Sequence, residues 1–374
     1  MNFVYGYENL DSTWKMVLII LYLVIGLLLI IKGGDFFVDS ASWIAERTGI
    51  PKLIIGATIV SLATTLPELL VSCFAAAEGA VSGTSSAVDI ATGNAIGSVI
   101  ANTGLIMSIS IIFMPVKIDR KAFILKPIIL LTSIALLFIF SIFGNLYVWE
   151  ACILFVILAI FFADNIYSAI KETKTRTALV SANTSIDLPK VNVPVEQKVE
   201  SKEDIASIEK VDSSTEKASK KKELWVNILK FVFGVAGIVV GAQFLVDNGT
   251  EFAVILGVPD KVIAITIIAI GTSLPELITT ITAIIKKQSD LSVGNIIGAN
   301  IIDLTLILSL CSFIYGGSLP IYKSTLYLDL PFCFAIVFVA TVPALITKKL
   351  HRWQGVACLV LYIIYLTLSC VLTF

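Results

Sequence analysis

The sequence predicts an all-α membrane protein with ten transmembrane helices arranged as two inverted five-helix repeats. Three observations lead to this fold class. Of the 374 residues, 57% are hydrophobic and only 15% are charged. Apolar runs of membrane-spanning length follow one another along most of the chain, and the second half repeats motifs of the first. A soluble protein this apolar would have no surface compatible with water.

A helix needs roughly 20 apolar residues to cross a bilayer. Runs of that kind predict spans near 16–45, 52–78, 88–114, 122–143, 147–170, 224–248, 259–285, 289–315, 324–346 and 353–373. Glu8, Asp11 and Lys15 precede the first run, where a signal peptide would have a basic stretch. We therefore expect a permanent span there and not a cleaved signal.

Basic residues alternate between the predicted loops. The odd-numbered loops hold most of them: Arg47, Lys52, Lys117, Arg120, Lys121, Lys126, Lys171, Lys174, Arg176, Lys286, Lys287, Lys348, Lys349 and Arg352. The even-numbered loops hold mainly Lys261 and Lys323. By the positive-inside rule, the odd loops face the cytoplasm and both termini lie outside, in a multi-pass protein of the plasma membrane. The formal net charge of −1 gives no basis for binding nucleic acid.

Residues 171–222 form a polar segment rich in Lys, Glu and Ser, without an aromatic residue. Such a segment buries too little apolar area to fold alone, so we expect a mobile cytoplasmic linker. Either a plain tether or a regulatory element fits this composition. The linker separates a first five-helix repeat, 1–170, from a second, 223–374.

The two halves match at a fixed offset. Asp39 corresponds to Asp247, and Glu68 to Glu276, both 208 residues apart. Further along, GNAIGSVIAN from Gly93 corresponds to GNIIGANIID from Gly294, 201 residues apart. The matching motifs span 56–105 and 264–307. Because each unit has five spans, an odd number, the second copy must be upside down, which is a plan of secondary transporters.

The stretch GATIVSLATTLPELL, residues 56–70, places a proline and a glutamate inside a predicted span. Pro67 cannot donate to the carbonyl of Ala63, and a carboxylate at mid-membrane costs roughly 2.5–3.5 kcal/mol on insertion scales. Thr64 and Thr65 share a helical face with Glu68. Free oxygen atoms and a negative charge at this depth indicate a bound cation or water.

The second copy repeats this arrangement with Thr272, Ser273 and Glu276, and Pro275 frees the carbonyl of Gly271. On the following helices, Ser98 and Asn102 are four residues apart and share a face. Ala299 and Asp303 occupy the same positions in the second copy. The glycines just before them, Gly93, Gly97, Gly294 and Gly298, form the small-xxx-small spacing that permits close helix contact.

The candidate cation ligands are therefore all oxygen donors from two repeated motifs: Thr64, Thr65, Glu68, Ser98, Asn102, Thr272, Ser273, Glu276 and Asp303. Hard oxygen ligands with up to three negative charges suit Ca²⁺ and also Na⁺. They do not suit Zn²⁺ or Cu, which prefer His and Cys. We expect transported ions at this site and no cofactor.

These paired motifs resemble the α-repeats of sodium/calcium exchangers, within the cation/calcium exchanger superfamily. The resemblance is strong over roughly 30–110 and 238–310 and extends to the rest by topology. It implies an ion-binding core made of helices 2, 3, 7 and 8, with helices 1 and 6 sliding across it. It also implies carbonyl ligands at Ser61 and Ala269, and an ion path within one chain.

Three residues depart from the family pattern. Ala63 replaces a usual glycine, and Thr65 stands where serine is common. Ala299 replaces a serine that the resemblance implies as a sodium ligand, which affects sodium binding more than calcium binding.

The function that follows is Na⁺-driven exchange of Ca²⁺, in which both ions compete for the same carboxylates. A Ca²⁺/H⁺ antiporter on the same scaffold is the alternative, with a glutamate carrying protons. A cation channel fits less well, since channels commonly assemble several copies around a pore. An enzyme is not expected, because the sequence has no constellation of catalytic residues.

Overall fold

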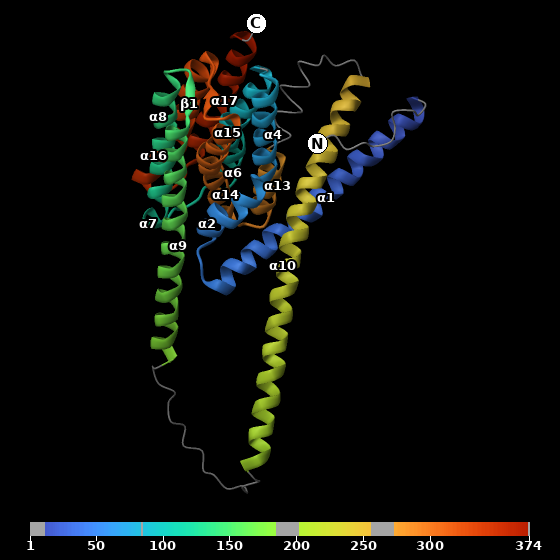
Figure 1. The fold of residues 1–374 in the computed structure, drawn as a ribbon. Helices are drawn as coiled ribbons and strands as arrows, with labels where there is room; N and C mark the ends of the chain where they lie inside the picture. Colours follow the sequence, from blue (N-terminus) through green and yellow to red (C-terminus); the bar gives the residue numbers. More distant parts are fainter. Residues whose placement is uncertain (1–11, 84, 185–201, 256–272, 373–374) are drawn as a thin grey trace.

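The computed structural model describes residues 12–83, 85–184, 202–255 and 273–372, and they form a bundle of helices with one small two-stranded sheet (Figure 1). Eight of the described helices are long and apolar enough to cross a membrane, and one bent pair makes a ninth span. They correspond to nine of the ten predicted spans. The remaining span, 259–285, is described only from residue 273, as the short apolar helix α13. The all-α membrane fold is confirmed.

The first half consists of α1 (Ser12–Thr48), α2 (Lys52–Ile55), η1 (Gly56–Val60), α3 (Ser61–Thr64), α4 (Leu66–Ser82), α5 (Ser85–Ala101), η2 (Asn102–Met107), α6 (Ser108–Phe113), α7 (Arg120–Phe123), α8 (Leu125–Ser141), β1 (Asn145–Tyr147) and α9 (Val148–Thr184). The second half consists of α10 (Lys202–Ile255), α13 (Leu274–Ile285), α14 (Ser289–Ile302), η4 (Asp303–Ile307), α15 (Leu308–Tyr315), β2 (Ser318–Pro320), η5 (Thr325–Asp329), α16 (Leu330–Thr347) and α17 (Arg352–Leu372). Elements labelled η are π-helical turns.

Both ends of the polar linker are helical in the structure. α9 continues to Thr184 and α10 begins at Lys202, and Figure 1 shows the two helices running well beyond the bundle. A helix that extends from a formed span needs no new nucleus, so even a polar sequence can propagate it. The central part of the predicted linker, 185–201, lies outside the described residues.

Loop contacts establish that the repeats are inverted. The loop after the fourth span pairs with the loop after the eighth, because β1 and β2 are antiparallel with Leu146 opposite Leu319. The loop after the third span meets the loop after the ninth, where the Leu350 amide donates to the Val116 carbonyl over 2.8 Å. The third and eighth loops are repeat equivalents, yet they lie at opposite ends of the bundle.

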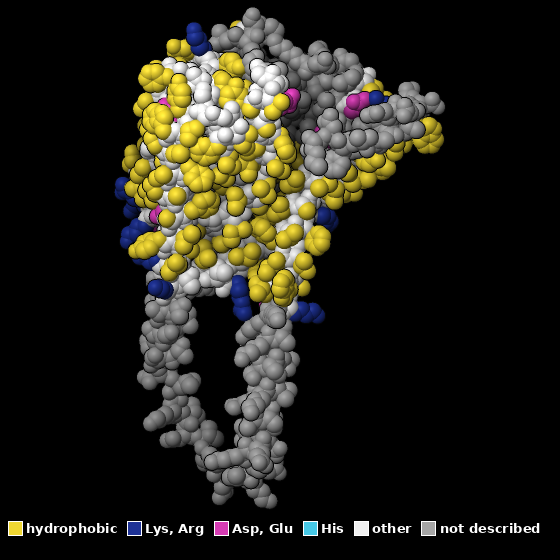
Figure 2. Space-filling model, viewed as in Figure 1, with side chains coloured by type: hydrophobic (Ala, Val, Ile, Leu, Met, Phe, Trp, Pro, Cys, Tyr) yellow, Lys and Arg dark blue, Asp and Glu magenta, His cyan; other side chains and the backbone are white. Residues whose placement is uncertain are grey.

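We call the end that contains Lys117 and Lys349 the basic end, and the end with β1 and β2 the strand end. Lys117 and Lys349 themselves form an isolated β-bridge. Figure 2 shows a broad apolar band across the face in view, with most of the visible Lys and Arg side chains toward its lower edge. A single apolar band edged by charge is the surface expected of a protein embedded in a bilayer.

The two halves interlock through glycines. Gly26 and Gly33 of α1 lie against the backbone of α10 at Gly241 and Gly234, with no room for a side chain between them. α1 and α10 are the first helices of their repeats, and they cross in the small-residue manner common in membranes.

A second close crossing joins α14 to the second span. A Cβ atom at Gly298 would lie 2.6 Å from both the Cα and the carbonyl oxygen of Ala57, and one at Gly294 would overlap the carbonyl of Leu53. The predicted close contact is thus confirmed for these two glycines. At Gly93 and Gly97, no atom among the described residues lies within 4 Å of an added Cβ.

We predict that Gly298→Ala lowers thermal stability, because the new methyl group meets backbone atoms that cannot rotate away. Overpacking of this kind costs about 1–3 kcal/mol. The melting temperature of the purified protein in detergent measures the effect. Ala135→Val enlarges a side chain on an exposed position of α8 and serves as the control. Equal melting temperatures for Gly298→Ala and the parent protein would contradict the described crossing.

Candidate cation site

The second span is broken at Thr65, where the helix bends by 46° between Lys52–Thr64 and Leu66–Ser82. Thr65 has φ −82° and ψ 0°, and its counterpart Ser273 has nearly the same angles, φ −90° and ψ 10°. Leu-Pro-Glu follows both residues and starts a helix in each copy. Proline is tolerated at this position since the first amides of a helix have no intrahelical acceptor. Each glutamate therefore lies in the first turn of a helix, where the helix dipole favours a negative charge.

The third and eighth spans contain a matching irregularity. Asn102 begins the π-helical segment η2, and its repeat equivalent Asp303 begins η4. π-helical turns inside α-helices occur often at functional sites. Two candidate ligands that correspond in sequence thus share an uncommon backbone geometry as well.

The acidic candidates are buried together. Glu68 is 1% exposed, while Glu276 and Asp303 are fully buried. Glu68 lies within electrostatic range of both other carboxylates. Around them, α4 packs against α5 and η4, and α13 packs against η2, which brings elements of both repeats to one region.

These side chains lack hydrogen-bond partners among the described residues. Both carboxylate oxygens of Glu68, Glu276 and Asp303 are without one, and so are both polar atoms of Asn102 and the hydroxyl of Ser273. A buried charge without a partner is costly, by several kcal/mol after relaxation of the surroundings. Such a cluster needs a cation or protons to be stable.

The described side chains do not form a closed metal centre. No group of three or more His, Cys, Asp or Glu residues in the described part meets at metal-binding distances. Thr64 lies near Glu276, but its hydroxyl donates to Asn295 Oδ1 over 3.2 Å. The carboxylates therefore face one region without the spacing of a preassembled chelate, so a bound cation would need further oxygen donors.

Several predicted oxygen donors turn back toward their own helix. The Ser61 carbonyl accepts the Thr65 amide at 2.9 Å and the Thr65 hydroxyl at 2.8 Å. The Thr64 hydroxyl lies 3.3 Å from the same carbonyl. The carbonyl that the family resemblance implies as a ligand is thus occupied by local hydrogen bonds in this conformation, since a threonine hydroxyl in a helix readily bonds to the preceding turn.

The other predicted site residues are placed as follows. Thr64, Thr65 and Ser98 are all buried, at 2%, 1% and 4% exposure. Thr272 and Ala269 lie outside the described residues, as does Gly271.

Two asparagines that sequence reasoning did not single out support the site. Asn94 donates to the Glu68 carbonyl over 3.2 Å and to Ser72 Oγ over 2.9 Å. Its repeat equivalent Asn295 donates to Thr279 Oγ1 over 3.1 Å and accepts from Thr64. The signal was present in the sequence, because both copies carry Gly-Asn at the start of the second motif.

One family description, "Sodium/calcium exchanger protein", matches this chain twice, over residues 18–166 and 226–371. The two matches fall on the two five-span halves and together cover most of the chain. The chain belongs to the sodium/calcium exchanger family. It is a multi-pass membrane protein.

Similar proteins and solved structures match most of the chain. The sodium/calcium exchanger MaX1 of Methanosarcina acetivorans is 32% identical over 92% of this chain and 97% of its own length. The inner membrane protein YrbG of Escherichia coli is 30% identical over 81% of this chain and 82% of its own. The solved structure of the sodium-calcium exchanger NCX_Mj soaked with 2.5 mM Na⁺ and 0.1 mM Ca²⁺ superposes with a TM-score of 0.70, at 25% identity, over 94% of this chain and 98% of that chain.

We predict that Glu276→Gln raises the melting temperature of the cation-free protein, because it removes one of three mutually repelling buried charges. The expected gain in the free energy of unfolding is about 1–3 kcal/mol. Adding Ca²⁺ should stabilise the parent more than the variant, since a ligand at 100 times its dissociation constant stabilises the protein that binds it by about 2.7 kcal/mol. Differential scanning fluorimetry with chelator and with Ca²⁺ measures both effects. If Ca²⁺ stabilises the Glu276→Gln variant as much as it stabilises the parent, Glu276 is not a Ca²⁺ ligand.

Proposed function

We propose that this protein exchanges Na⁺ for Ca²⁺ across the plasma membrane by alternating access, with the ions bound near the midplane between helices 2, 3, 7 and 8. The observation that carries the proposal is the buried set of carboxylates from both repeats, which have no hydrogen-bond partner among the described residues. The nine candidate ligands named from the sequence, Thr272 included, form the proposed ion-binding set. Membership of the exchanger family supports cation exchange more generally.

We further propose that the basic end faces the cytoplasm, so that both termini are extracytoplasmic and the helical extensions of α9 and α10 lie inside the cell. The distribution of Lys and Arg over the odd-numbered loops supports this orientation. The transport unit is proposed to be one chain, because carboxylates of both repeats lie within electrostatic range of one another in it.

Ca²⁺/H⁺ antiport is the second candidate. The same partnerless carboxylates favour it, since protons neutralise buried acids as well as metal ions do. Hydroxyl groups beside both glutamates favour the sodium reaction, because they complete an oxygen shell that a proton does not need.

Flux measurements separate the two. In sealed vesicles containing the purified protein, ⁴⁵Ca²⁺ uptake should follow an imposed Na⁺ gradient. Uptake that follows only a pH gradient would select the proton reaction, and uptake that follows neither gradient would indicate a channel. Empty vesicles give the background.

We predict that Glu68→Gln and Glu276→Gln each reduce Na⁺-driven Ca²⁺ flux by about 100-fold or more, since removing one partner of a buried charged pair costs about 3–5 kcal/mol. Glu78→Gln, an exposed position on the same helix as Glu68, is the matched control and should transport normally. Near-normal flux in either buried variant would exclude that residue as a ligand.

We predict that Ala299→Ser lowers the Na⁺ concentration for half-maximal exchange by about twofold to tenfold, because one added hydroxyl contributes about 0.5–1.5 kcal/mol. Ala299 is fully buried and corresponds to Ser98 in the first repeat. The Ca²⁺ dependence should change less than the Na⁺ dependence. Ala344→Ser, also fully buried but on α16, controls for the polarity of the substitution. An unchanged Na⁺ dependence would show that this position does not contribute a sodium ligand.

A further inference from the structure

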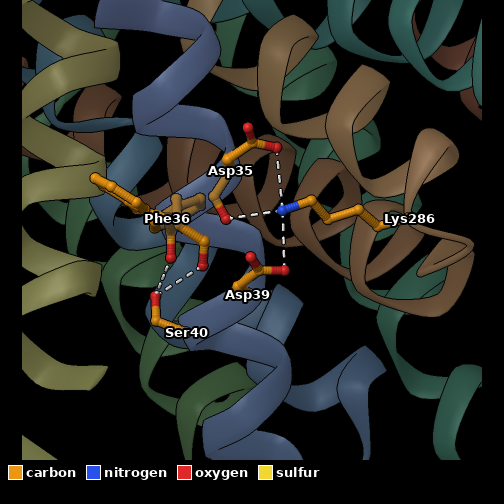
Figure 3. Close-up of polar contacts among 6 residues, drawn as sticks. Asp35, Phe36, Asp39, Ser40 and Lys286 are labelled. Atoms are coloured by element: carbon orange, nitrogen blue, oxygen red, sulfur yellow. Dashed lines mark hydrogen bonds and ion pairs between the residues drawn. The ribbon is translucent and has the colours of Figure 1, made fainter. Parts of the chain in front are cut away.

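A three-residue ion network joins α1 to α13 at the basic end. Lys286 Nζ lies 3.1 Å from Asp35 Oδ1 and 2.9 Å from Asp39 Oδ1, and it donates to the Asp35 carbonyl over 3.0 Å. Figure 3 shows the ammonium group between the two carboxylates, which lie one helical turn apart on α1. One side chain at the end of α13 therefore holds three oxygen atoms of α1.

α1 and α13 are also in direct contact beside this network, at Gly34 and Thr282. A Cβ atom at Gly34 would lie 2.8 Å from Thr282 Oγ1 and 3.2 Å from Ile278 Cγ2. Thr282 precedes Lys286 by four residues, so it lies on the same face of the chain. The absence of a side chain at Gly34 lets α1 approach closely enough for Lys286 to reach both aspartates.

The segment of α1 beside the network closes the candidate site on this end. Phe37 and Val38 are 0% and 1% exposed. With Asn295, Thr279 and Ser292 they line a cavity of only about 10 Å³, about the space of one water molecule. Asn295 bonds directly to Thr64 of the candidate site. Phe37 and Val38 thus pack against that polar shell.

The repeat equivalents of the network carry a different charge pattern. At the offset of 208 residues, Lys286 corresponds to Glu78, Asp39 to Asp247 and Asp35 to Gln243. Glu78 and Asp247 have the same charge, so these positions cannot form the lysine–aspartate pair of the first helix. Gly34 corresponds to Ala242, which has a side chain at the point of closest approach.

The equivalent faces of α13 and α4 also differ in exposure. Thr282, beneath α1, is 9% exposed, whereas its counterpart Phe74 on α4 is 67% exposed. Leu70, the counterpart of Ile278, is 53% exposed. α1 covers α13 at the basic end, while the same face of α4 toward the other end is open.

We propose that Lys286 is a positioning residue that holds α1 over the candidate site, and that it biases the protein toward the conformation closed at the basic end. The proposal rests on the proposed function, in which α1 moves as the site changes the side that it faces. The counterpart of Lys286 is the acidic Glu78, which cannot pair with Asp247 as Lys286 pairs with Asp39. The exchange cycle is therefore asymmetric although its two halves are repeats.

Lys286→Gln tests the proposal, with Lys287→Gln as the matched control, because Lys287 is the adjacent exposed lysine. In vesicles of known orientation, Lys286→Gln should lower the half-saturating Ca²⁺ concentration at the basic end and raise it at the other end. Each shift should be about threefold to tenfold, the range for losing a small ion network that biases two states. Lys286→Arg should restore the parent values, since it keeps the charge.

Hydrogen exchange gives a readout that does not depend on transport. The backbone amides of residues 35–45 should exchange faster in Lys286→Gln, and at the parent rate in Lys286→Arg and Lys287→Gln. Unchanged exchange together with unchanged half-saturating concentrations would overturn the proposal. Faster exchange of this segment in a protein that shows no Na⁺-driven Ca²⁺ flux would support the network's role while refuting the proposed function.

Discussion

Charge burial is the constraint on which this structure depends. Three carboxylates, Glu68, Glu276 and Asp303, lie inside an apolar bundle with no hydrogen-bond partner among the described residues. A membrane protein keeps such groups only where they bind something or relay protons, because they are expensive in hydrocarbon. The broken second span, the π-helical turns and the paired asparagines all lie around them. Each of these features brings polar atoms to the bundle centre without opening it to lipid.

The inverted repeat explains how a bundle of nearly uniform helices builds such a centre. Each half supplies one helix that starts at Leu-Pro-Glu, with the glutamate in its first turn, and one helix with a π-helical turn. Close glycine crossings hold the halves together, α1 on α10 and the second span on α14. The halves are not identical in chemistry, since Asn102 and Ser98 correspond to Asp303 and Ala299. The negative charge is therefore distributed unevenly across the pseudo-twofold axis.

Much of this architecture could be predicted from the sequence. The spans follow from apolar length, the inversion follows from an odd number of spans per unit, and the break follows from Pro67 beside Glu68. The π-helical turns at Asn102 and Asp303 could not be predicted, because nothing in the local composition distinguishes them from regular helix. The Ser61 carbonyl is occupied by hydroxyls from its own helix, a choice between local and distant partners that sequence spacing does not decide. The ion ligands themselves stay predictions.

The helical extensions were missed for a different reason. Composition correctly indicates that residues 171–222 cannot make a core, but a helix needs no core when it grows from an anchored span. Asn94 and Asn295 were not predicted as site residues because they carry neither a charge nor a hydroxyl group, although the same Gly-Asn pair occurs in both copies. Repetition of a residue at equivalent positions was as informative as its chemistry.

The interlocked glycines have a consequence for the assembly of the chain. α1 lies on α10 of the opposite half, and the second span lies on α14 of the opposite half, so each half covers glycine surfaces of the other. A five-helix half on its own would present these surfaces to lipid. Each half therefore depends on a copy in the reverse orientation for its packing, and the fused chain supplies that copy at a fixed ratio of one to one.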